Sequence, residues 1–141
     1  MHARRIIHRD VKLDNLMFPT DPLTHEDAFD KLVIIDFGFA VEANCCDGNS
    51  ESEKNNPNAW SFTDSDQRYR KVIVGTSSYW APEVVECYDS TNTEMRYHIA
   101  SDMWAVGVIM FTMGFLTYPF FGEDSPGPGW YPTLRRNILN M

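Results

Sequence analysis

One stretch of the sequence, residues 103–116, is apolar on every side, and it limits what the chain can fold into. Ser101 and Asp102 precede it and can accept hydrogen bonds from the first free N–H groups of a helix. A helix that is apolar all round is buried inside a domain, and this run is too short to span a bilayer. The sequence therefore predicts a central helix whose large side chains fill a core. These side chains are Met103, Trp104, Met110, Phe111 and Met113.

Few other elements are available to cover such a helix. Residues 16–18 and 32–35 are strand-like, and residues 134–141 could form a last short helix. Residues 42–67 are polar and hold six carboxylates against one lysine, so they bury too little apolar surface to offset their chain entropy. We therefore expect an incomplete α+β unit that carries a disordered insertion at residues 42–67.

Composition excludes several classes of partner. Asp and Glu number 20 against 12 Lys and Arg, a net charge of −8, which repels nucleic-acid backbones and anionic membranes but permits a basic protein partner. The cysteines are odd in number and two are adjacent (Cys45, Cys46, Cys87), so they predict reduced thiols and a cytoplasmic location rather than a disulfide framework. The N-terminus has no apolar segment of the kind that a signal peptide needs. Nothing in the sequence indicates an oligomeric state.

Four motifs follow one another along the chain. Residues 8–15 read HRDVKLDN, residues 36–38 read DFG after an apolar strand, residues 75–83 read GTSSYWAPE, and residues 102–107 read DMWAVG at the start of the apolar helix. Each alone arises easily by chance, but all four in this order and setting form a specific pattern. On these residues the chain resembles the C-terminal lobe of a eukaryotic protein kinase of the serine/threonine type.

The resemblance implies a partial protein-kinase-like fold over residues 1–141, mainly helical, with a short β-hairpin that carries the catalytic and metal-binding loops. Residues 42–67 become an insertion in the activation segment. The family's preceding lobe, with its glycine-rich loop and nucleotide-binding lysine, has no counterpart in the sequence. We therefore expect a truncated gene model, and a 141-residue chain that is inactive alone. In the family, Glu83 pairs with an arginine beyond Met141. The wording around the motifs leans toward the calcium/calmodulin-dependent group.

The resemblance also implies roles for individual residues. Asp10 would accept the proton of the substrate hydroxyl, Lys12 would contact the γ-phosphate, and Thr76 would hydrogen-bond both. Asn15 and Asp36 would be the oxygen ligands of Mg²⁺, which keeps waters and takes further ligands from phosphates. Lys12, Asn15 and Asp36 would thus bind the cofactors ATP and Mg²⁺, and the partner would be a protein substrate. Taken alone, Asp10 and Asp36 could equally be turn residues.

Arg9, directly before the catalytic aspartate, implies control by a phosphate in the activation segment, because its guanidinium can pair with one. The customary acceptor position, three residues before the glycine of the third motif, holds Val72. Two alternatives remain open. Ser61, Thr63 or Ser65 could accept the phosphate instead, or Arg9 could be satisfied in another way.

Asp14 lies where basophilic kinases often keep an acid that meets a substrate arginine. It therefore predicts a preference for a basic side chain upstream of the target serine or threonine, although Arg135 and Arg136 in the last helix oppose it. The competing function is a non-catalytic, kinase-derived interaction module or degenerate product without ATP turnover. The intact catalytic and metal-binding residues favour the enzyme.

Overall fold

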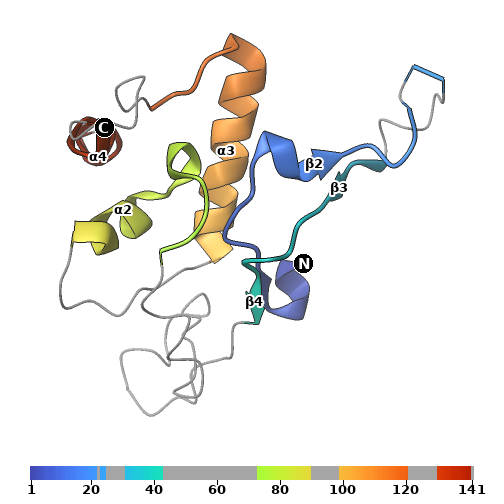
Figure 1. Ribbon diagram of the computed structural model, residues 1–141, viewed down its shortest axis with the longest axis horizontal. Coiled ribbons are helices and arrows are strands. Elements are labelled where there is room, and N and C mark those ends of the chain that lie inside the picture. The colour runs from blue at the N-terminus through green and yellow to red at the C-terminus, as the bar shows by residue number, and fades with distance from the viewer. Residues whose placement is uncertain (22, 25–30, 43–72, 90–98, 121–129, 141) are drawn as a thin grey trace.

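The computed structural model describes residues 1–21, 23–24, 31–42, 73–89, 99–120 and 130–140 (Figure 1). The elements, in which η marks a short 3-10 helix, are η1 His2–Arg4, β1 Ile6–Ile7, η2 Leu13–Asn15, β2 Leu16–Met17, β3 Val33–Ile34, β4 Val41–Glu42, η5 Ser77–Tyr79, α2 Pro82–Asp89, α3 Ile99–Phe115 and α4 Trp130–Leu139. The predicted α+β class is confirmed. Apart from Glu42, which belongs to β4, the predicted insertion lies outside the described residues, as do Cys45, Cys46, Ser61, Thr63, Ser65 and Val72.

Two short antiparallel strand pairs frame the first motif. The predicted hairpin is present, because β2 pairs with β3 with Leu16 opposite Ile34 and Met17 opposite Val33. The second pair joins β1 to β4, with Ile7 opposite Val41, and the sequence did not predict it. Residues 8–15 lie between β1 and β2, and the DFG motif lies between β3 and β4. The two strand pairs therefore bring the first and second motifs side by side (Figure 1).

Helix α3 runs as a long rod past the catalytic loop (Figure 1), and only one side of it is covered. Ala105, Val108 and Ile109 are buried against Val11 and Tyr79. The prediction that α3 is buried all round is wrong. The exposed fractions are 55% for Met103, 69% for Met110, 38% for Phe111 and 66% for Met113, while Trp104 is half-buried and stacks on Phe120. No helix in the described ranges has the length and hydropathy to cross a membrane.

The described residues explain this exposure. Apolar composition predicts that an element prefers burial, but it does not say how many neighbours the element has. The catalytic loop and η5 contact one face of α3, and nothing in the described ranges packs over the methionines on the other face.

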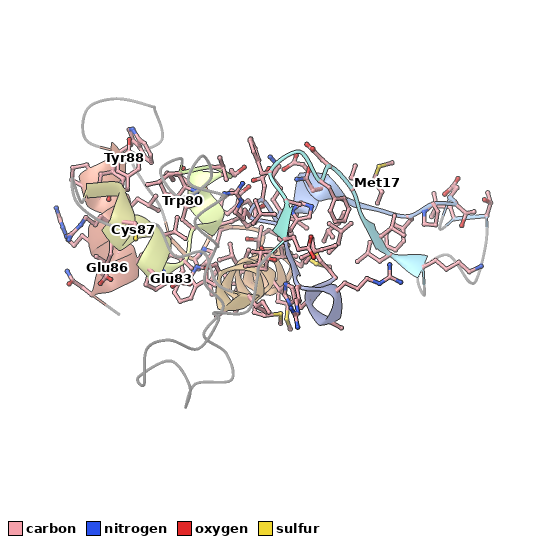
Figure 2. The ribbon with its side chains drawn as sticks, turned by 90° about the horizontal axis from the view of Figure 1, so that it is seen from below. Met17, Trp80, Glu83, Glu86, Cys87 and Tyr88 are labelled. Atoms are coloured by element: carbon pink, nitrogen blue, oxygen red, sulfur yellow. The ribbon has the colours of Figure 1, made fainter. Side chains whose placement is uncertain are left out.

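Helices α2 and α4 form a second packed region, at the opposite end of the molecule from Met17 on the hairpin (Figure 2). Val85 of α2 is fully buried against Leu134 and Ile138 of α4. The Tyr131 hydroxyl donates to the Val85 carbonyl at 2.8 Å, and the Tyr131 ring lies 4.3 Å from that of Tyr88. Helix α4 starts at Trp130, earlier than the predicted 134.

Glu83, for which the resemblance implied an arginine beyond the chain, has a partner inside it. The Ser101 hydroxyl at the start of α3 donates to Glu83 Oε1 at 2.6 Å, which joins α2 to α3. Ser101 is buried, so its loss leaves a partly buried carboxylate without this donor.

We expect Ser101→Ala to lower the free energy of unfolding by about 1–3 kcal/mol, the range for a hydrogen bond to a charged group. Urea denaturation followed by circular dichroism measures this change. Thr117→Ala, at an exposed position after α3, is the matched control and should change stability by less than about 0.5 kcal/mol. Equal stability of the two variants would contradict a stabilising role for this contact.

Candidate active site

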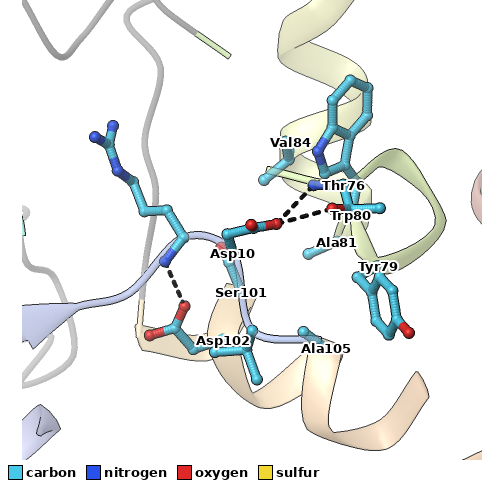
Figure 3. A pocket seen from close by; sticks show the side chains of 11 residues that line it. Asp10, Thr76, Tyr79, Trp80, Ala81, Val84, Ser101, Asp102 and Ala105 are labelled. Atoms are coloured by element: carbon cyan, nitrogen blue, oxygen red, sulfur yellow. Dashed lines mark hydrogen bonds between the residues drawn. The ribbon is translucent and has the colours of Figure 1, made fainter. Parts of the chain in front are cut away.

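One buried carboxylate of α3 holds the backbone of the catalytic loop. Asp102 accepts hydrogen bonds from the amides of His8 and Arg9, each at 2.9 Å (the second is drawn in Figure 3). His2 Nε2 lies 2.9 Å from the same carboxylate, which is only 3% exposed. The two amides before Asp10 are therefore fixed to the first turn of α3, and the direction of the Asp10 side chain follows.

The structure brings Asp10, Lys12 and Thr76 together as predicted. Asp10 Oδ1 accepts from the Thr76 amide at 2.9 Å and from its hydroxyl at 3.0 Å (Figure 3). Lys12 Nζ lies 3.1 Å from Asp10 Oδ2 and donates to Thr76 Oγ1 at 3.0 Å. A carboxylate, an ammonium and a hydroxyl thus form one closed network, in which the carboxylate is 6% exposed.

The third motif reaches Asp10 only because Gly75 allows it. Gly75 has φ +89°, in the left-handed region, and a Cβ built on it would lie 2.4 Å from the backbone oxygen of Arg9. The chain therefore crosses the catalytic loop at a distance that only glycine permits. The crossing borders a pocket that extends to Tyr79 and the first turns of α3 (Figure 3). Burial and the Tyr118 hydroxyl raise the pKa of Tyr79 to about 12, so it stays neutral.

Asn15 joins this network, and its amide orientation is fixed. Asn15 Nδ2 donates to the Asp10 carbonyl at 2.8 Å and lies 3.3 Å from Asp10 Oδ2. The nitrogen is thereby committed, which leaves Oδ1 as the side-chain atom with ligand chemistry. The Ile35 amide donates to the Asn15 carbonyl at 2.9 Å, so Asp36 follows directly beside it.

Asp36 is near the network but is not hydrogen-bonded to it within the described part of the chain. Its Oδ1 accepts from the Gly38 amide at 3.2 Å, and its φ of 59° turns the chain sharply after β3. The carboxylate is exposed. The described ranges hold no cluster of three or more His, Cys, Asp or Glu that could bind a metal. Two oxygen donors, from Asn15 and Asp36, do fit Mg²⁺, which keeps several waters and shares phosphate oxygens.

Three contacts tie the DFG segment to the catalytic loop. His8 Nε2 lies 3.2 Å from the Ile35 carbonyl, and the His8 ring meets the Phe37 ring edge-on at 4.9 Å. Arg9 Nε donates to the Phe39 carbonyl at 2.6 Å. The sequence predicted the packing role of His8 and Phe37. It gave no sign of His2 or Ser101, whose partners lie far away along the chain. Asp14 lies in η2 with its side chain exposed.

The pKa of Asp10 reflects opposing effects. Burial acts to raise it, but the hydrogen bonds from Lys12 and Thr76 and the charge of Lys12 together bring the pKa below its ordinary value of 3.8. The carboxylate is therefore ionised at neutral pH. Because the folded pKa is depressed, this ionisation stabilises the fold above pH 3.8, and the contribution is lost as the pH falls through the folded pKa.

We expect Lys12→Met to raise the pKa of Asp10, because both the hydrogen bond and the charge that lower it are removed. The carboxyl ¹³C shift of Asp10, followed by NMR from pH 2 to 6, measures the change. Lys31→Met, which removes an exposed charge outside the network, is the control and should leave the titration unchanged. An unshifted Asp10 titration in Lys12→Met would contradict the described network.

The comparisons with known proteins agree with this geometry. The family model of the protein kinase domain matches residues 1–131. The chain belongs to the protein kinase family. Calcium-dependent protein kinase 6 of Plasmodium berghei is 31% identical over 99% of this chain, and human RAC-beta serine/threonine-protein kinase is 32% identical over 88%. These relatives confirm the predicted serine/threonine kinase family, and the first belongs to a calcium-dependent type, toward which the motif wording leans.

The solved structures give the fold. The granulovirus kinase PK-1 of Cydia pomonella has a TM-score of 0.57 with 20% identity over 99% of this kinase chain, which covers 36% of that structure. The partial kinase-like fold is thereby confirmed. The chain spans 7% of the length of the Plasmodium kinase and 18% of RAC-beta.

Proposed function

We propose that this chain supplies the catalytic and metal-binding loops of a cytoplasmic protein serine/threonine kinase, which transfers the γ-phosphate of ATP to a serine or threonine hydroxyl of a protein substrate. The observation that carries the proposal is the Asp10–Lys12–Thr76 network with Asn15 fixed beside it. Phosphoryl transfer depends on positioning and charge neutralisation rather than on covalent catalysis, and this network supplies both.

Each group has a task that its surroundings support. Asp10, ionised at neutral pH, accepts a hydrogen bond from the substrate hydroxyl and orients its oxygen toward the phosphate. Lys12 donates to Thr76, lies beside Asp10, and offers its charge to the transferred phosphate. Asn15 Oδ1 and the Asp36 carboxylate would hold Mg²⁺, which when bound neutralises negative charge on the triphosphate.

The substrate class also follows from a carboxylate. Asp14 is exposed on η2, four residues after Asp10, where it can attract a cationic side chain of a bound peptide. We therefore propose a preference for arginine or lysine upstream of the phosphorylated residue. A peptide array in which removing upstream arginines leaves phosphorylation unchanged would reject this preference without affecting the kinase assignment.

The test uses the full-length gene product. Calorimetry measures Mg²⁺-dependent ATP binding, and radiolabelled ATP measures transfer to a serine peptide with upstream arginines. We expect Asp10→Asn to lower the transfer rate by about 10²–10⁴-fold while ATP still binds. Asp36→Asn should remove the Mg²⁺ dependence of binding. Asp21→Asn, at an exposed turn, is the control that should change neither. A full-length protein that folds but neither binds Mg²⁺-ATP nor transfers phosphate would overturn the proposal in favour of a non-catalytic module.

A further inference from the structure

Arg9 connects three separate motifs through three of its own atoms. Its amide donates to Asp102 of α3 at 2.9 Å, and its Nε donates to the Phe39 carbonyl at 2.6 Å. Its carbonyl oxygen lies where Gly75 crosses, so close that a Cβ on Gly75 would be 2.4 Å away. The residue has φ 67° and is 7% exposed. One strained, buried arginine thus holds the catalytic loop, the DFG segment and the Gly75 crossing in register.

The contact with Phe39 is a charge-assisted hydrogen bond, which is shorter and stronger than one between neutral groups. It acts at the start of the activation segment, directly after Asp36-Phe37-Gly38. A guanidinium that bonds Phe39 while only 7% exposed leaves little surface for a hydrated phosphate dianion. The sequence supports the same reading, because Val72 stands at the customary acceptor position and has no hydroxyl to phosphorylate.

We infer that Arg9 is a positioning residue that holds the metal-binding segment against the catalytic loop through the Phe39 carbonyl, so that the site assembles independently of activation-segment phosphorylation. This inference rests on the proposed kinase function and concerns its regulation. It decides between the two alternatives for Arg9 in favour of the one in which the protein's own backbone satisfies the guanidinium.

The first test asks whether phosphate is needed. The full-length protein is treated with a broad-specificity phosphatase, and complete dephosphorylation is verified by mass spectrometry. A variant with Ser61→Ala, Thr63→Ala and Ser65→Ala is measured in parallel. We expect kcat for peptide phosphorylation to stay within about twofold of the untreated protein in both cases. A loss of kcat in the treated protein, with Mg²⁺-ATP binding retained, would overturn the inference and leave the proposed kinase function intact.

The second test addresses the positioning role itself. Arg9→Lys keeps the charge but removes the Nε donor, and Arg4→Lys on η1, at an exposed position, is its matched control. We expect Arg9→Lys to weaken Mg²⁺-dependent ATP binding and to lower kcat by about tenfold, because the Asp36 segment loses its tether. Mg²⁺-independent nucleotide binding should be unchanged, which a general loss of stability would not produce. Equal Mg²⁺ dependence in both variants would overturn the inference. A wild-type protein without any transfer activity would instead remove the proposed function on which it rests.

Discussion

Replacing Asp102 by alanine is expected to lower the free energy of unfolding by about 3–5 kcal/mol, because it leaves two buried amide donors unsatisfied at about 1–3 kcal/mol each. The amides of His8 and Arg9 both bond to this carboxylate, and His2 loses its partner as well. Urea denaturation gives the stability change, and amide hydrogen exchange shows whether His8 and Arg9 lose their protection.

Two variants calibrate this measurement. Asp102→Asn keeps the shape and one acceptor oxygen, so its loss should fall between zero and that of alanine. Asp21→Ala removes an exposed carboxylate that bonds only within its own turn, and it should change stability by less than about 0.5 kcal/mol. If Asp102→Ala were no more destabilising than Asp21→Ala, the carboxylate would not be the anchor of the catalytic loop.

The second large effect is expected from Gly75→Ala, with a loss of about 2–4 kcal/mol from backbone strain and displacement. The added methyl group would meet the Arg9 backbone oxygen, which cannot rotate away as a side chain could, and φ +89° is unfavourable for alanine. The displaced segment carries Thr76, so the pKa of Asp10 should also rise as it loses those hydrogen bonds.

Gly107→Ala provides the matched control for this substitution. Gly107 lies inside α3 with nothing within 4 Å of an added Cβ, so alanine should be neutral or stabilise the helix by up to about 1 kcal/mol. Thermal unfolding of both variants gives the comparison. Similar melting temperatures for the two would show that the crossing at Gly75 is not as close as described.

The sequence was most informative where chemistry and local pattern coincide. The β-branched run before the DFG motif predicted β3, and the order of the four motifs predicted that Asp10, Lys12 and Thr76 meet. The start of α3 at a carboxylate was also visible, although only the structure shows that Asp102 turns its oxygens to the His8 and Arg9 amides instead of capping its own helix.

Other features depend on distant partners, and local patterns do not contain them. The two-residue strands β1 and β4 form because their chain segments meet, and neither has the length of a recognisable strand. His2 and Ser101 gain their roles from Asp102 and Glu83, far along the sequence. Helix α2 was missed although Pro82 at its first position is a known helix start. The roles of Asn15 and Asp36 as metal ligands stay a prediction.

The bonds from Asp102 to the catalytic loop join residues 94 and 93 positions apart, and those from Asp10 to Thr76 span 66. Contacts of such separation close large loops and form slowly compared with local ones. The nucleotide site therefore comes into being only when the whole chain has found its topology. A fluorescent ATP analogue that requires this site would serve as a reporter of completed folding, and its signal should lag behind the appearance of helical circular dichroism during refolding.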